Sequence, residues 1–561
     1  MKEKIWLKHY PQEIPHQIDY PDVPLTQFLV DAVRDFPERE AIHFLGKKIT
    51  YAKLMEDVSR FANVLISLGV KRRDRVAIML PNCPQAVIAY YGALMIGAVV
   101  VQTNPMYVAR ELEHQLKDSG AETIICLDLL FSKVREVKSQ TAIKRIITTS
   151  IKDYLPFPKN ILYPLTLLKE GIKTNIPVDN QTIFSFPELL KKALSHFPHA
   201  DIVPNQDIAL LQYTGGTTGL AKGAMLTHRN LVVNAIQAAA WIYKNQRGKT
   251  KILGVLPFFH VYGMTVVMNF AVLQAATMIL VPKFDRDMIL KTIHKHQPNL
   301  FPGAPTMYVG VINHPDIHRF DVSSIEACIS GSAPLPLEVQ ERFEKLTGGR
   351  LTEGYGMTET SPVTHCNLIW DRKKSATIGL PWPDTECRIV DLETGEELGI
   401  GEIGELHVRG PQVMKGYWNR PEETTKVLVD GWFHTGDIAK MDEDGYFYII
   451  DRKKDMIIAG GFNIYPRDIE EVLYEHPAIQ EAAVIGIPDE YRGETVKAFV
   501  VLKPGANLTE KELDQYCREK LSKYKVPRFY EFRDDLPKTM IGKVLRRILQ
   551  EEEHAKGNLK K

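Results

Sequence analysis

The chain has 561 residues, too many for one hydrophobic core, so we expect at least two domains, with the larger one divided internally. Its 70 Lys and Arg residues nearly balance its 69 Asp and Glu residues, and the net charge of +1 argues against a general nucleic-acid-binding protein with an overall positive surface. The N-terminus lacks the apolar run of a signal peptide, and the six cysteines form no Cys-x-x-Cys pair. These features favour a protein located in the reducing cytoplasm.

The first third of the chain alternates between strand and helix signals. Residues 41–50 predict two short strands, after which Thr50 caps a helix with its apolar residues on one face. The signals that follow are, in order, a strand at 74–81, a helix to Ile96, a strand at 99–105, a helix at 109–120 and a strand at 121–127. This βαβαβ order indicates a parallel sheet with helices on its faces.

The longest uncharged run lies between Cys83 and Pro105. Its apolar core is shorter than the roughly 20 residues of a helix that spans a membrane. Gly97 separates a helical half from a β-branched half, so the run predicts a buried helix that leads into a buried strand.

A second copy of this pattern follows later in the chain. Residues 252–260, an apolar helix and residues 276–282 repeat the strand, helix, strand order, and Pro257 and Pro282 flank the helix as Pro81 and Pro105 flank the first. We therefore expect two similar α/β halves. From about Thr385, short β runs with turns predict a small β-barrel-like or mixed region, and a compact α+β segment follows residues 451–455.

Residues 151–177 mix aliphatic side chains with lysines and are broken by prolines. We favour an ordered surface excursion packed on the domain, with contact to a membrane surface as the alternative. The prolines are expected to prevent a long amphipathic helix.

The stretch from Tyr213 to Gly223, YTGGTTGLAKG, is the strongest local signal for chemistry. Glycines let backbone N–H groups converge on an anion, and hydroxyls and an ammonium add further donors, so the loop predicts a polyphosphate site. A strand is expected before it, and a turn, a Thr227 cap and a helix after it. The alternative is that this stretch is a flexible turn and that Lys222 is a solvated surface lysine.

Other glycine motifs do not pass their context tests. Residues 399–404 fit G-x-G-x-x-G but precede a strand-like run rather than a helix, so they indicate a turn. Tyr243 stands where a Walker loop ending at Lys249 and Thr250 would need its first glycine, and no G-x-S-x-G elbow occurs.

Seven motifs in order resemble those of the adenylate-forming enzymes, the superfamily of acyl-CoA synthetases, luciferase and peptide-synthetase adenylation domains, over nearly the whole chain. They are YTGGTTGLAKGAMLTHRN, LPFFHVYG, ISGSAPL, EGYGMTETSP, GWFHTGDIA, DRKKDMI and PKTMIGKV. Residues 430–466 are further similar to the signature stretch of fatty acyl-CoA synthetases, of the bacterial long-chain fatty acid–CoA ligase type.

The resemblance implies a large N-terminal AMP-binding domain, residues 1–450, and a small mobile C-terminal α+β domain, residues 451–561, that carries a catalytic lysine. It implies ATP-dependent activation of a medium- to long-chain fatty acid through an acyl-adenylate to acyl-CoA, with ATP, Mg²⁺ and coenzyme A. An aryl or short-chain acid–CoA ligase is the alternative. A homodimer and a peripheral contact with the inner face of the membrane are left open, and no nucleic-acid partner is expected.

The resemblance also assigns the nucleotide site. ATP binding falls to Thr214, Gly215, Gly216, Thr217, Thr218, Gly219, Lys222, Gly331, Ser332, Ala333, Glu353, Gly354, Tyr355, Gly356, Met357, Thr358, Asp437, Ile449 and Arg452. Lys222 would neutralise phosphate charge, and Glu359 with the Thr214 hydroxyl would hold Mg²⁺ through oxygen ligands. The Tyr355 ring would lie on adenine, and Asp437 would accept hydrogen bonds from both ribose hydroxyls.

The remaining assignments concern the reacting groups. The resemblance implies that Lys543, His260 and Thr214 are catalytic. Lys543 would be the cation that bridges the carboxylate and the α-phosphate and so stabilises the developing charge. The acyl pocket would include His260, Val261, Tyr262 and Met264, and Gly460 and Gly461 would line the path of CoA. Asp451 would be the hinge. Taken singly, each of these residues would be read as structural or as a solvated surface group.

Overall fold

The computed structural model describes residues 4–169, 176–198, 200–214, 221–459, 462–489, 492–538 and 544–558. The chain divides into two compact units, and each is described by itself. The large unit comprises Trp6–Glu386 and Arg409–Gly431, and the small unit comprises Met1–Ile5, Cys387–Val408 and Trp432–Lys561.

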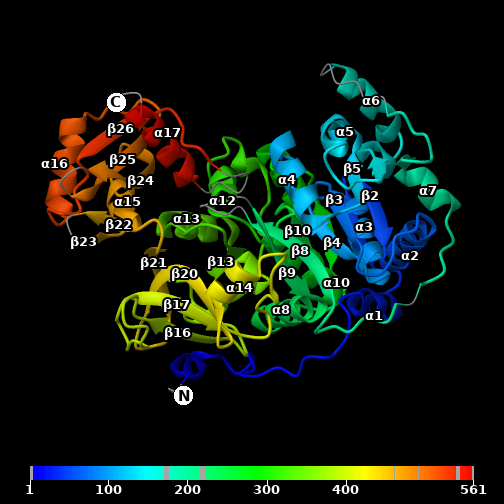
Figure 1. Ribbon diagram of the computed structural model, residues 1–561, viewed down its shortest axis with the longest axis horizontal. Coiled ribbons are helices and arrows are strands. Elements are labelled where there is room, and N and C mark those ends of the chain that lie inside the picture. Colours follow the sequence, from blue (N-terminus) through cyan, green and yellow to red (C-terminus); the bar gives the residue numbers. More distant parts are fainter. Residues whose placement is uncertain are drawn as a thin grey trace. The chain divides into compact units, whose positions relative to one another are not determined.

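The large unit contains a mostly parallel sheet whose strand order is β18-β9-β8-β4-β3-β5-β6-β7 (Figure 1). Its strands are β3 (Arg75–Met79), β4 (Val99–Gln102), β5 (Thr123–Leu127), β6 (Arg145–Thr149), β7 (Ile183–Ser185), β8 (Ile208–Thr214), β9 (Lys222–Thr227) and β18 (Gly416–Tyr417). The predicted βαβαβ order is confirmed, since β4, β3 and β5 are parallel neighbours.

Helices cover both faces of this sheet. β4 and β5 lie on opposite sides of β3 in the sheet, so the connections from β3 to β4 and from β4 to β5 run in opposite directions. Because both crossovers are right-handed, their helices lie on opposite faces of the sheet. On one face α4 (Ala109–Ser119) and α5 (Phe131–Lys138) bury Leu112, Leu116, Phe131 and Val134 against β3, β4 and β5. On the other face α3 (Pro84–Met95) packs against β3, β4 and α2 (Tyr51–Ser67).

Helix α3 and strand β4 confirm the interpretation of the long uncharged run as a buried helix that leads into a buried strand. Each residue from Pro84 to Met95 is buried, as is each residue of β4. The side chain of Thr50 accepts a hydrogen bond from the Lys53 N–H and so caps α2, as predicted. Among the described residues, no helix has both the length and the apolar character required to cross a bilayer.

The second half of the large unit repeats the design. Strands β10 (Lys251–Gly254) and β11 (Thr277–Leu280) are parallel neighbours, joined by α9 (Val261–Gly263), the π-helix η4 (Met264–Asn269) and α10 (Phe270–Leu273). The sheet order is β10-β11-β1-β2, with β1 (Glu40–Phe44) and β2 (Lys47–Thr50). This arrangement confirms the two similar α/β halves.

A further sheet has the order β12-β13-β14-β15 and joins β10 through single bridges at Leu300. Its strands are β12 (Ala327–Ser330), β13 (Arg350–Gly356), β14 (Val363–Cys366) and β15 (Leu380–Pro381). The other elements of the large unit are α1 (Gln27–Asp35), η2 (Asp128–Leu130), η3 (Ile151–Tyr154), α6 (Lys159–Lys169), α7 (Phe186–Lys192), α8 (His228–Trp241), α11 (Arg286–His296), α12 (Pro305–Ile312), η5 (Ile317–Arg319), α13 (Leu337–Thr347), η6 (Thr358–Thr360), α14 (Pro421–Val427) and β19 (Leu428–Val429); η1 (Ile5–His9) begins the described chain.

Two local expectations in the large unit are wrong. The residues after the glycine-rich loop form strand β9 rather than a turn, although Thr227 does cap α8 by accepting from the Asn230 N–H. The prolines also fail to stop a helix at 159–169, because Pro164 lies inside α6. A proline removes one backbone donor from a helix but leaves the remaining hydrogen bonds available.

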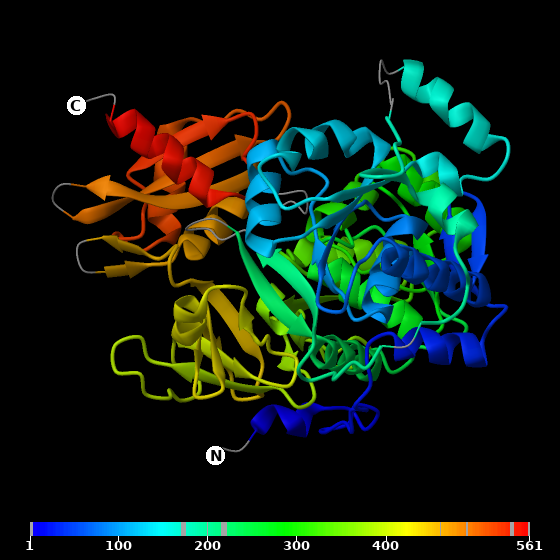
Figure 2. The same ribbon diagram turned by 45° about the vertical axis from the view of Figure 1, so that its right-hand side comes forward.

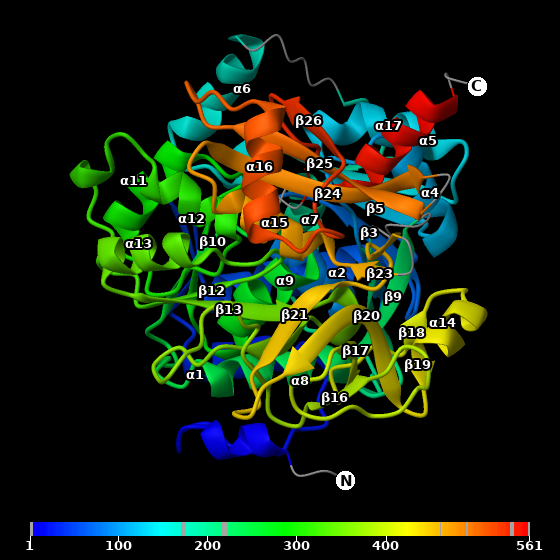
Figure 3. The same cartoon turned by 90° about the vertical axis from the view of Figure 1, so that its left-hand side faces the viewer.

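The small unit combines an antiparallel sheet with a mixed sheet (Figure 3). The first contains β16 (Glu386–Val390), β17 (Gly404–Arg409), β20 (Trp432–Met441) and β21 (Phe447–Arg452), and in the described residues it is open and does not close into a barrel. As expected, residues 399–403 form a turn before β17. The predicted boundary at 450 falls inside β21 and stays a prediction.

The mixed sheet contains β22 (Ile457–Ala459), β23 (Phe462–Ile464), β24 (Ile479–Asp489), β25 (Gly493–Leu502) and β26 (Phe529–Arg533). Alternate residues of β25 point to opposite faces. Val496 and Ala498 pack with α15 (Pro466–Tyr474) and α16 (Glu510–Lys520), whereas Phe499 packs with Leu549 of α17 (Arg546–Asn558). The compact α+β segment is confirmed.

Candidate functional site

The glycine-rich loop connects two paired strands of the large sheet. Thr214 is the last residue of β8 and Lys222 the first of β9, and the two are partners in the antiparallel ladder. Both are partly exposed, while the strand residues behind them are buried. The hairpin therefore fixes the two ends of the loop next to each other at a sheet edge.

Lys222 is surrounded by groups from the segment 416–423. Its Nζ forms an ion pair with the Glu423 carboxylate and lies 5.3 Å from the centroid of the Tyr417 ring. Tyr417 belongs to β18, which pairs with β9. A cation that has both a carboxylate and an aromatic face as partners is held in one region rather than freely solvated.

Glu359, the predicted metal ligand, lies on η6, which packs against β8 and β9. The Tyr417 hydroxyl donates to Glu359 Oε1 over 2.7 Å, and the Met414 N–H donates to the Glu359 carbonyl over 2.7 Å. Burial, followed by the charge of Glu359, raises the pKa of Tyr417, so this hydroxyl stays protonated and remains a donor. One tyrosine thus links Lys222 to Glu359.

The predicted adenine site is assembled at the ends of two parallel strands. β12 and β13 pair with Ser330 opposite Glu353, which places Gly331, Ser332 and Ala333 beside Gly354, Tyr355 and Gly356. Ser332 has a φ of +72°, a left-handed conformation that is uncommon outside glycine and clusters at functional sites. Glu353 Oε2 accepts from the Leu335 N–H over 3.1 Å, which ties the segment that follows β12 to β13.

The predicted acyl motif contacts this same edge. His260 caps α9, where its Nδ1 accepts from the Tyr262 N–H over 3.3 Å. The Tyr262 hydroxyl donates to the Ile329 carbonyl over 2.8 Å, two residues before Gly331, the first of the predicted adenine residues on this strand end. Val261, Tyr262 and Met264 are all buried, and the helix continues as π-helix η4, a form that recurs at functional sites.

A surface hollow in the large unit lies apart from these residues. It measures about 370 Å³ and runs between α11 and the ends of β1 and β11, with His43, Lys291 and His296 in its wall. None of the predicted site residues in the described part of the chain lines it. The predicted motifs, in contrast, are brought together, because η6, which follows β13, packs against β8 and β9.

In the small unit, the predicted ribose and hinge residues share one hairpin. Asp437 of β20 is opposite Arg452 of β21, and Asp437 Oδ1 lies 3.4 Å from Arg452 Nε. Ile449 and Asp451 belong to the same strand, β21. The hairpin therefore brings a buried carboxylate and a guanidinium together, and both groups can hydrogen-bond to hydroxyls.

Asp451 is held from several directions. Its Oδ2 accepts from the Arg467 N–H over 2.7 Å at the start of α15, and Arg546 Nη1 lies 3.7 Å from its Oδ1. Arg546 also pairs with Glu470 at 2.6 Å and with Asp455 at 3.1 Å. Burial raises the pKa of Asp451 to about 6, against the opposing effect of Arg546. The predicted hinge residue thus ties β21 to α15 and α17.

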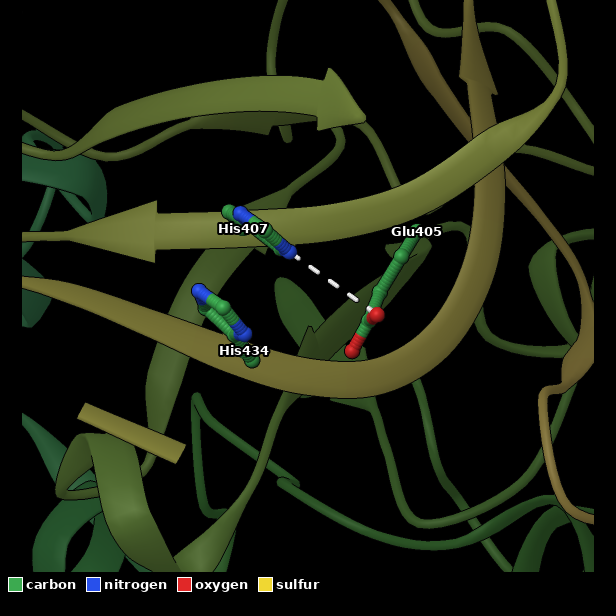
Figure 4. A group of neighbouring side chains, drawn as sticks. All are labelled: Glu405, His407 and His434. Atoms are coloured by element: carbon green, nitrogen blue, oxygen red, sulfur yellow. Dashed lines mark ion pairs between the residues drawn. The ribbon is translucent and has the colours of Figure 1, made fainter. Parts of the chain in front are cut away.

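A cluster that the sequence did not predict lies beside Asp437. Figure 4 shows His407 of β17 and His434 of β20 with stacked rings, and the Glu405 carboxylate beside His407. The ring centroids are 3.7 Å apart with an interplanar angle of 9°, and Glu405 Oε2 lies 3.8 Å from His407 Nε2.

The three side chains could in principle hold a metal ion, but their geometry argues against it. Imidazole lone pairs lie in the ring plane, so stacked rings direct their nitrogens in parallel rather than at one ion. Glu405 is also engaged, since the Lys453 ammonium lies 3.0 Å from Oε2 and the Gly436 N–H donates to Oε1 over 3.0 Å. Glu405 therefore anchors the turn that precedes Asp437.

Several predicted residues lie outside the described residues: Gly215, Gly216, Thr217, Thr218 and Gly219 of the loop, Gly460 and Gly461 of the CoA path, and Lys543. The sequence missed Tyr417, Glu423 and Glu405. No spacing marks them, because their contacts depend on the pairing of β18 with β9 and of β17 with β20.

Comparison with known proteins identifies the family of this fold and site. The model of the AMP-binding enzyme family matches residues 29–418, and that of the AMP-binding enzyme C-terminal domain matches residues 468–543. The chain belongs to the AMP-binding enzyme family.

Its relatives are named more narrowly. The chain is 54% identical over 562 residues to Long-chain-fatty-acid–CoA ligase of Bacillus subtilis, covering 100% of both chains. It is 42% identical to the protein of that name from Yersinia pestis, over 98% of each chain. The crystal structure of ATP-bound MatB from Rhodopseudomonas palustris is 31% identical with a TM-score of 0.83, over 94% of this chain and 99% of that one.

Proposed function

We propose that the chain converts a medium- to long-chain fatty acid into its acyl-CoA in two steps, using ATP and releasing AMP and pyrophosphate. The observation that carries this proposal is the match along the entire chain to relatives named Long-chain-fatty-acid–CoA ligase, at 54% and 42% identity. ATP and CoA are substrates that fit the AMP-binding enzyme family.

The chemistry follows from the poor reactivity of a carboxylate. In the first step a carboxylate oxygen bonds to the α-phosphorus of ATP, and the bond from that phosphorus to the bridging oxygen breaks, so pyrophosphate leaves. In the second step the CoA thiolate adds to the acyl carbon and the bond to AMP breaks. Adenylation thus gives the acyl carbon a phosphate ester, AMP, as its leaving group in place of an oxide ion.

The residues take the following proposed roles. Thr214, the loop and Lys222 bind the leaving phosphates, while Tyr355 with Gly331 and Gly354 encloses adenine. Asp437 and Arg452 bind ribose. Lys543 bridges the attacking carboxylate and the α-phosphate, and His260 shapes the entry of the acyl chain beside Tyr262 and Met264. Gly460 and Gly461 admit pantetheine after the small domain turns about Asp451.

Mg²⁺ is proposed as the metal. The fit is chemical: Glu359 and Thr214 offer a carboxylate and a hydroxyl, Mg²⁺ prefers oxygen ligands, and η6, which carries Glu359, packs against β8, which ends in Thr214. The ion would neutralise phosphate charge when bound. Glu359 is also kept in place by the Tyr417 hydroxyl.

Acid-dependent exchange of labelled pyrophosphate into ATP tests the first step. A panel of acids from acetate to C18, assayed for AMP release with and without CoA, tests the substrate class. We expect turnover with the longer acids; turnover confined to aromatic or short acids would favour the alternative, an aryl or short-chain acid–CoA ligase. A protein that binds nucleotide without exchange would be a binder rather than an enzyme.

The proposed role of Lys543 is tested by separating the two half-reactions. Lys543→Ala should abolish adenylate formation but keep most thioester formation from supplied acyl-AMP, because the lysine acts on the charge that develops at the α-phosphate. Equal loss in both half-reactions would remove the assignment.

We further propose a cytoplasmic enzyme that touches the inner face of the membrane through α6. Five large apolar side chains on or just before this helix are exposed: Phe157 78%, Ile161 62%, Leu162 51%, Leu165 54% and Leu168 58%. Contiguous exposed apolar surface marks contact sites, and lysines at both ends of α6 favour an anionic lipid surface. A homodimer stays a prediction that sedimentation velocity can test.

A further inference from the structure

The Lys222 ammonium forms an ion pair with the Glu423 carboxylate, a residue to which the proposed reaction assigns no role. Lys222 follows the glycine-rich loop, and Glu423 lies in the first turn of α14, far away in sequence. Each side chain is about one-third exposed, at 32% and 33%. A polyphosphate that approaches Lys222 therefore meets an ammonium that already has an anionic partner.

Backbone contacts fix this partner in place. The Trp418 N–H donates to the Gly223 carbonyl over 2.8 Å, directly after Lys222. The Tyr417 N–H donates to Thr424 Oγ1 over 2.9 Å, and Thr424 Oγ1 donates to the Arg420 carbonyl over 2.8 Å. These hydrogen bonds hold the start of α14 next to strand β9. The backbone at Glu423 is therefore held close to Lys222.

The surroundings provide Glu423 with a second cation. Arg420 Nε lies 3.8 Å from Glu423 Oε1, and Arg420 Nη2 lies 2.8 Å from Asp118 Oδ1. Asp118 also accepts from the Tyr213 hydroxyl over 2.7 Å. When Lys222 changes partner, Glu423 therefore keeps the Arg420 guanidinium nearby and is not left without a cation.

We propose that Glu423 is a positioning residue that holds the Lys222 ammonium while no polyphosphate is bound and takes it back as pyrophosphate leaves. This inference rests on the proposed function. The triphosphate must replace one anion with another at Lys222, so Glu423 weakens polyphosphate binding. The same competition favours departure of pyrophosphate after adenylation, when the product still carries the β- and γ-phosphates.

The substitution Glu423→Gln separates charge from shape. Glutamine keeps an oxygen that accepts from Lys222 but removes the negative charge that competes with phosphate. We expect pyrophosphate to bind about fivefold more tightly, in the range of a partly exposed ion pair, and to inhibit ATP consumption at correspondingly lower concentration. AMP binding should not change, because AMP lacks the phosphates that reach Lys222.

Glu422→Gln is the matched control, since Glu422 is exposed on the same turn of α14 and its loss changes the net charge equally. A general electrostatic effect would appear in both variants. The specific competition should appear only in Glu423→Gln, and it should vanish when Lys222 is replaced by Met. Thermal melting of each variant checks that the fold is retained.

Calorimetric titration of the purified full chain and its variants with magnesium pyrophosphate, and separately with AMP, tests the proposal. Tighter pyrophosphate binding in Glu423→Gln alone, with unchanged AMP binding, supports it. Equal effects in both glutamine variants, weaker pyrophosphate binding in Glu423→Gln, or an effect that persists without Lys222 overturns it. Absence of acid-dependent exchange in the unaltered chain would instead contradict the proposed function, so the two failures are distinguishable.

Discussion

The ring of Tyr262 lies directly against Gly331, where a Cβ atom would stand 3.0 Å from Tyr262 Cε1. The same tyrosine donates its hydroxyl to the Ile329 carbonyl over 2.8 Å. Tyr262 belongs to the predicted acyl motif and Gly331 to the predicted adenine site. The two predicted sites therefore share a wall, and a change in one residue of this wall affects the other by direct contact.

Gly331→Ala should raise KM for ATP and KM for the acid together, by about tenfold each, because the new methyl group displaces the tyrosine ring in a packed wall. Steady-state kinetics with each substrate varied measures both constants. Tyr262→Leu in the same chain should relieve the clash and recover part of the loss. If ATP binding is lost equally with Tyr262 present or replaced, the methyl group obstructs the nucleotide directly and the shared wall is not the cause.

Tyr417→Phe removes the hydroxyl that holds Glu359 Oε1 at 2.7 Å. We expect a stability loss of about 1 kcal/mol and a Mg²⁺ concentration for half-saturation raised about fivefold, since Glu359 loses its orientation. Denaturant unfolding and a Mg²⁺ titration of activity provide the two measurements.

Tyr20→Phe is the control for this change, because Tyr20 donates to Asp384 over 2.8 Å in a comparable tyrosine–carboxylate bond. It should affect stability without altering the response to Mg²⁺. A Mg²⁺ response that is unchanged in Tyr417→Phe would show that Glu359 needs no support from this hydroxyl.

The sequence predicts those parts of the fold that depend on local patterns. The position of Gly97, between residues typical of a helix and β-branched residues, predicts both α3 and β4. Every residue of these two elements is buried, so the pattern of apolar and polar residues cannot distinguish them, and the glycine and the β-branched residues do. β9 was missed, since GAMLT alternates weakly and becomes a strand only through its pairing with β8.

The candidate site divides in the same way. Thr214, Tyr355 and Asp437 lie in motifs that can be read from consecutive residues, whereas Glu405 and Glu423 act on those motifs from other strands and helices. The stacking of His407 on His434 follows from the register of β17 against β20. If β17 were shifted by one residue against β20, one of the two rings would point to the other face of the sheet. The residue pattern of each strand does not specify how the two strands pair.

Glu405→Gln should make the stability of the protein less dependent on acid pH. Burial alone would raise the pKa of Glu405, but the neighbouring His407 ring and the hydrogen bonds from the Lys453 ammonium and the Gly436 N–H lower it to about 2. Because this value is below the ordinary 4.5, the stabilisation is present above pH 4.5 and is lost as the pH falls toward 2. The variant should be less stable by about 2 to 3 kcal/mol at neutral pH.

The difference in apparent Tm between the two proteins should therefore narrow as the pH falls from 5 to 3. Glu443→Gln, at an exposed position of the same unit, should leave the curve unchanged. KM for ATP should also rise in Glu405→Gln, because the turn before Asp437 loses its anchor at Gly436. A pH-independent difference would mean that Glu405 stabilises the fold without its charge.

Removal of apolar surface from α6 should weaken binding to membranes without affecting catalysis on soluble acids. The triple variant Ile161→Ser, Leu165→Ser, Leu168→Ser replaces three side chains that are more than half exposed, so the fold loses little buried area. Each would contribute roughly 1 kcal/mol on insertion into the interface, so affinity for vesicles of phosphatidylglycerol and phosphatidylethanolamine should fall more than tenfold.

Leu194→Ser, at an exposed leucine outside α6, is the control for the triple variant and should sediment with vesicles as the unaltered chain does. Because lysines flank the helix, binding of the unaltered chain should also weaken with salt. Equal sedimentation of the triple variant and the unaltered chain would place any membrane contact elsewhere.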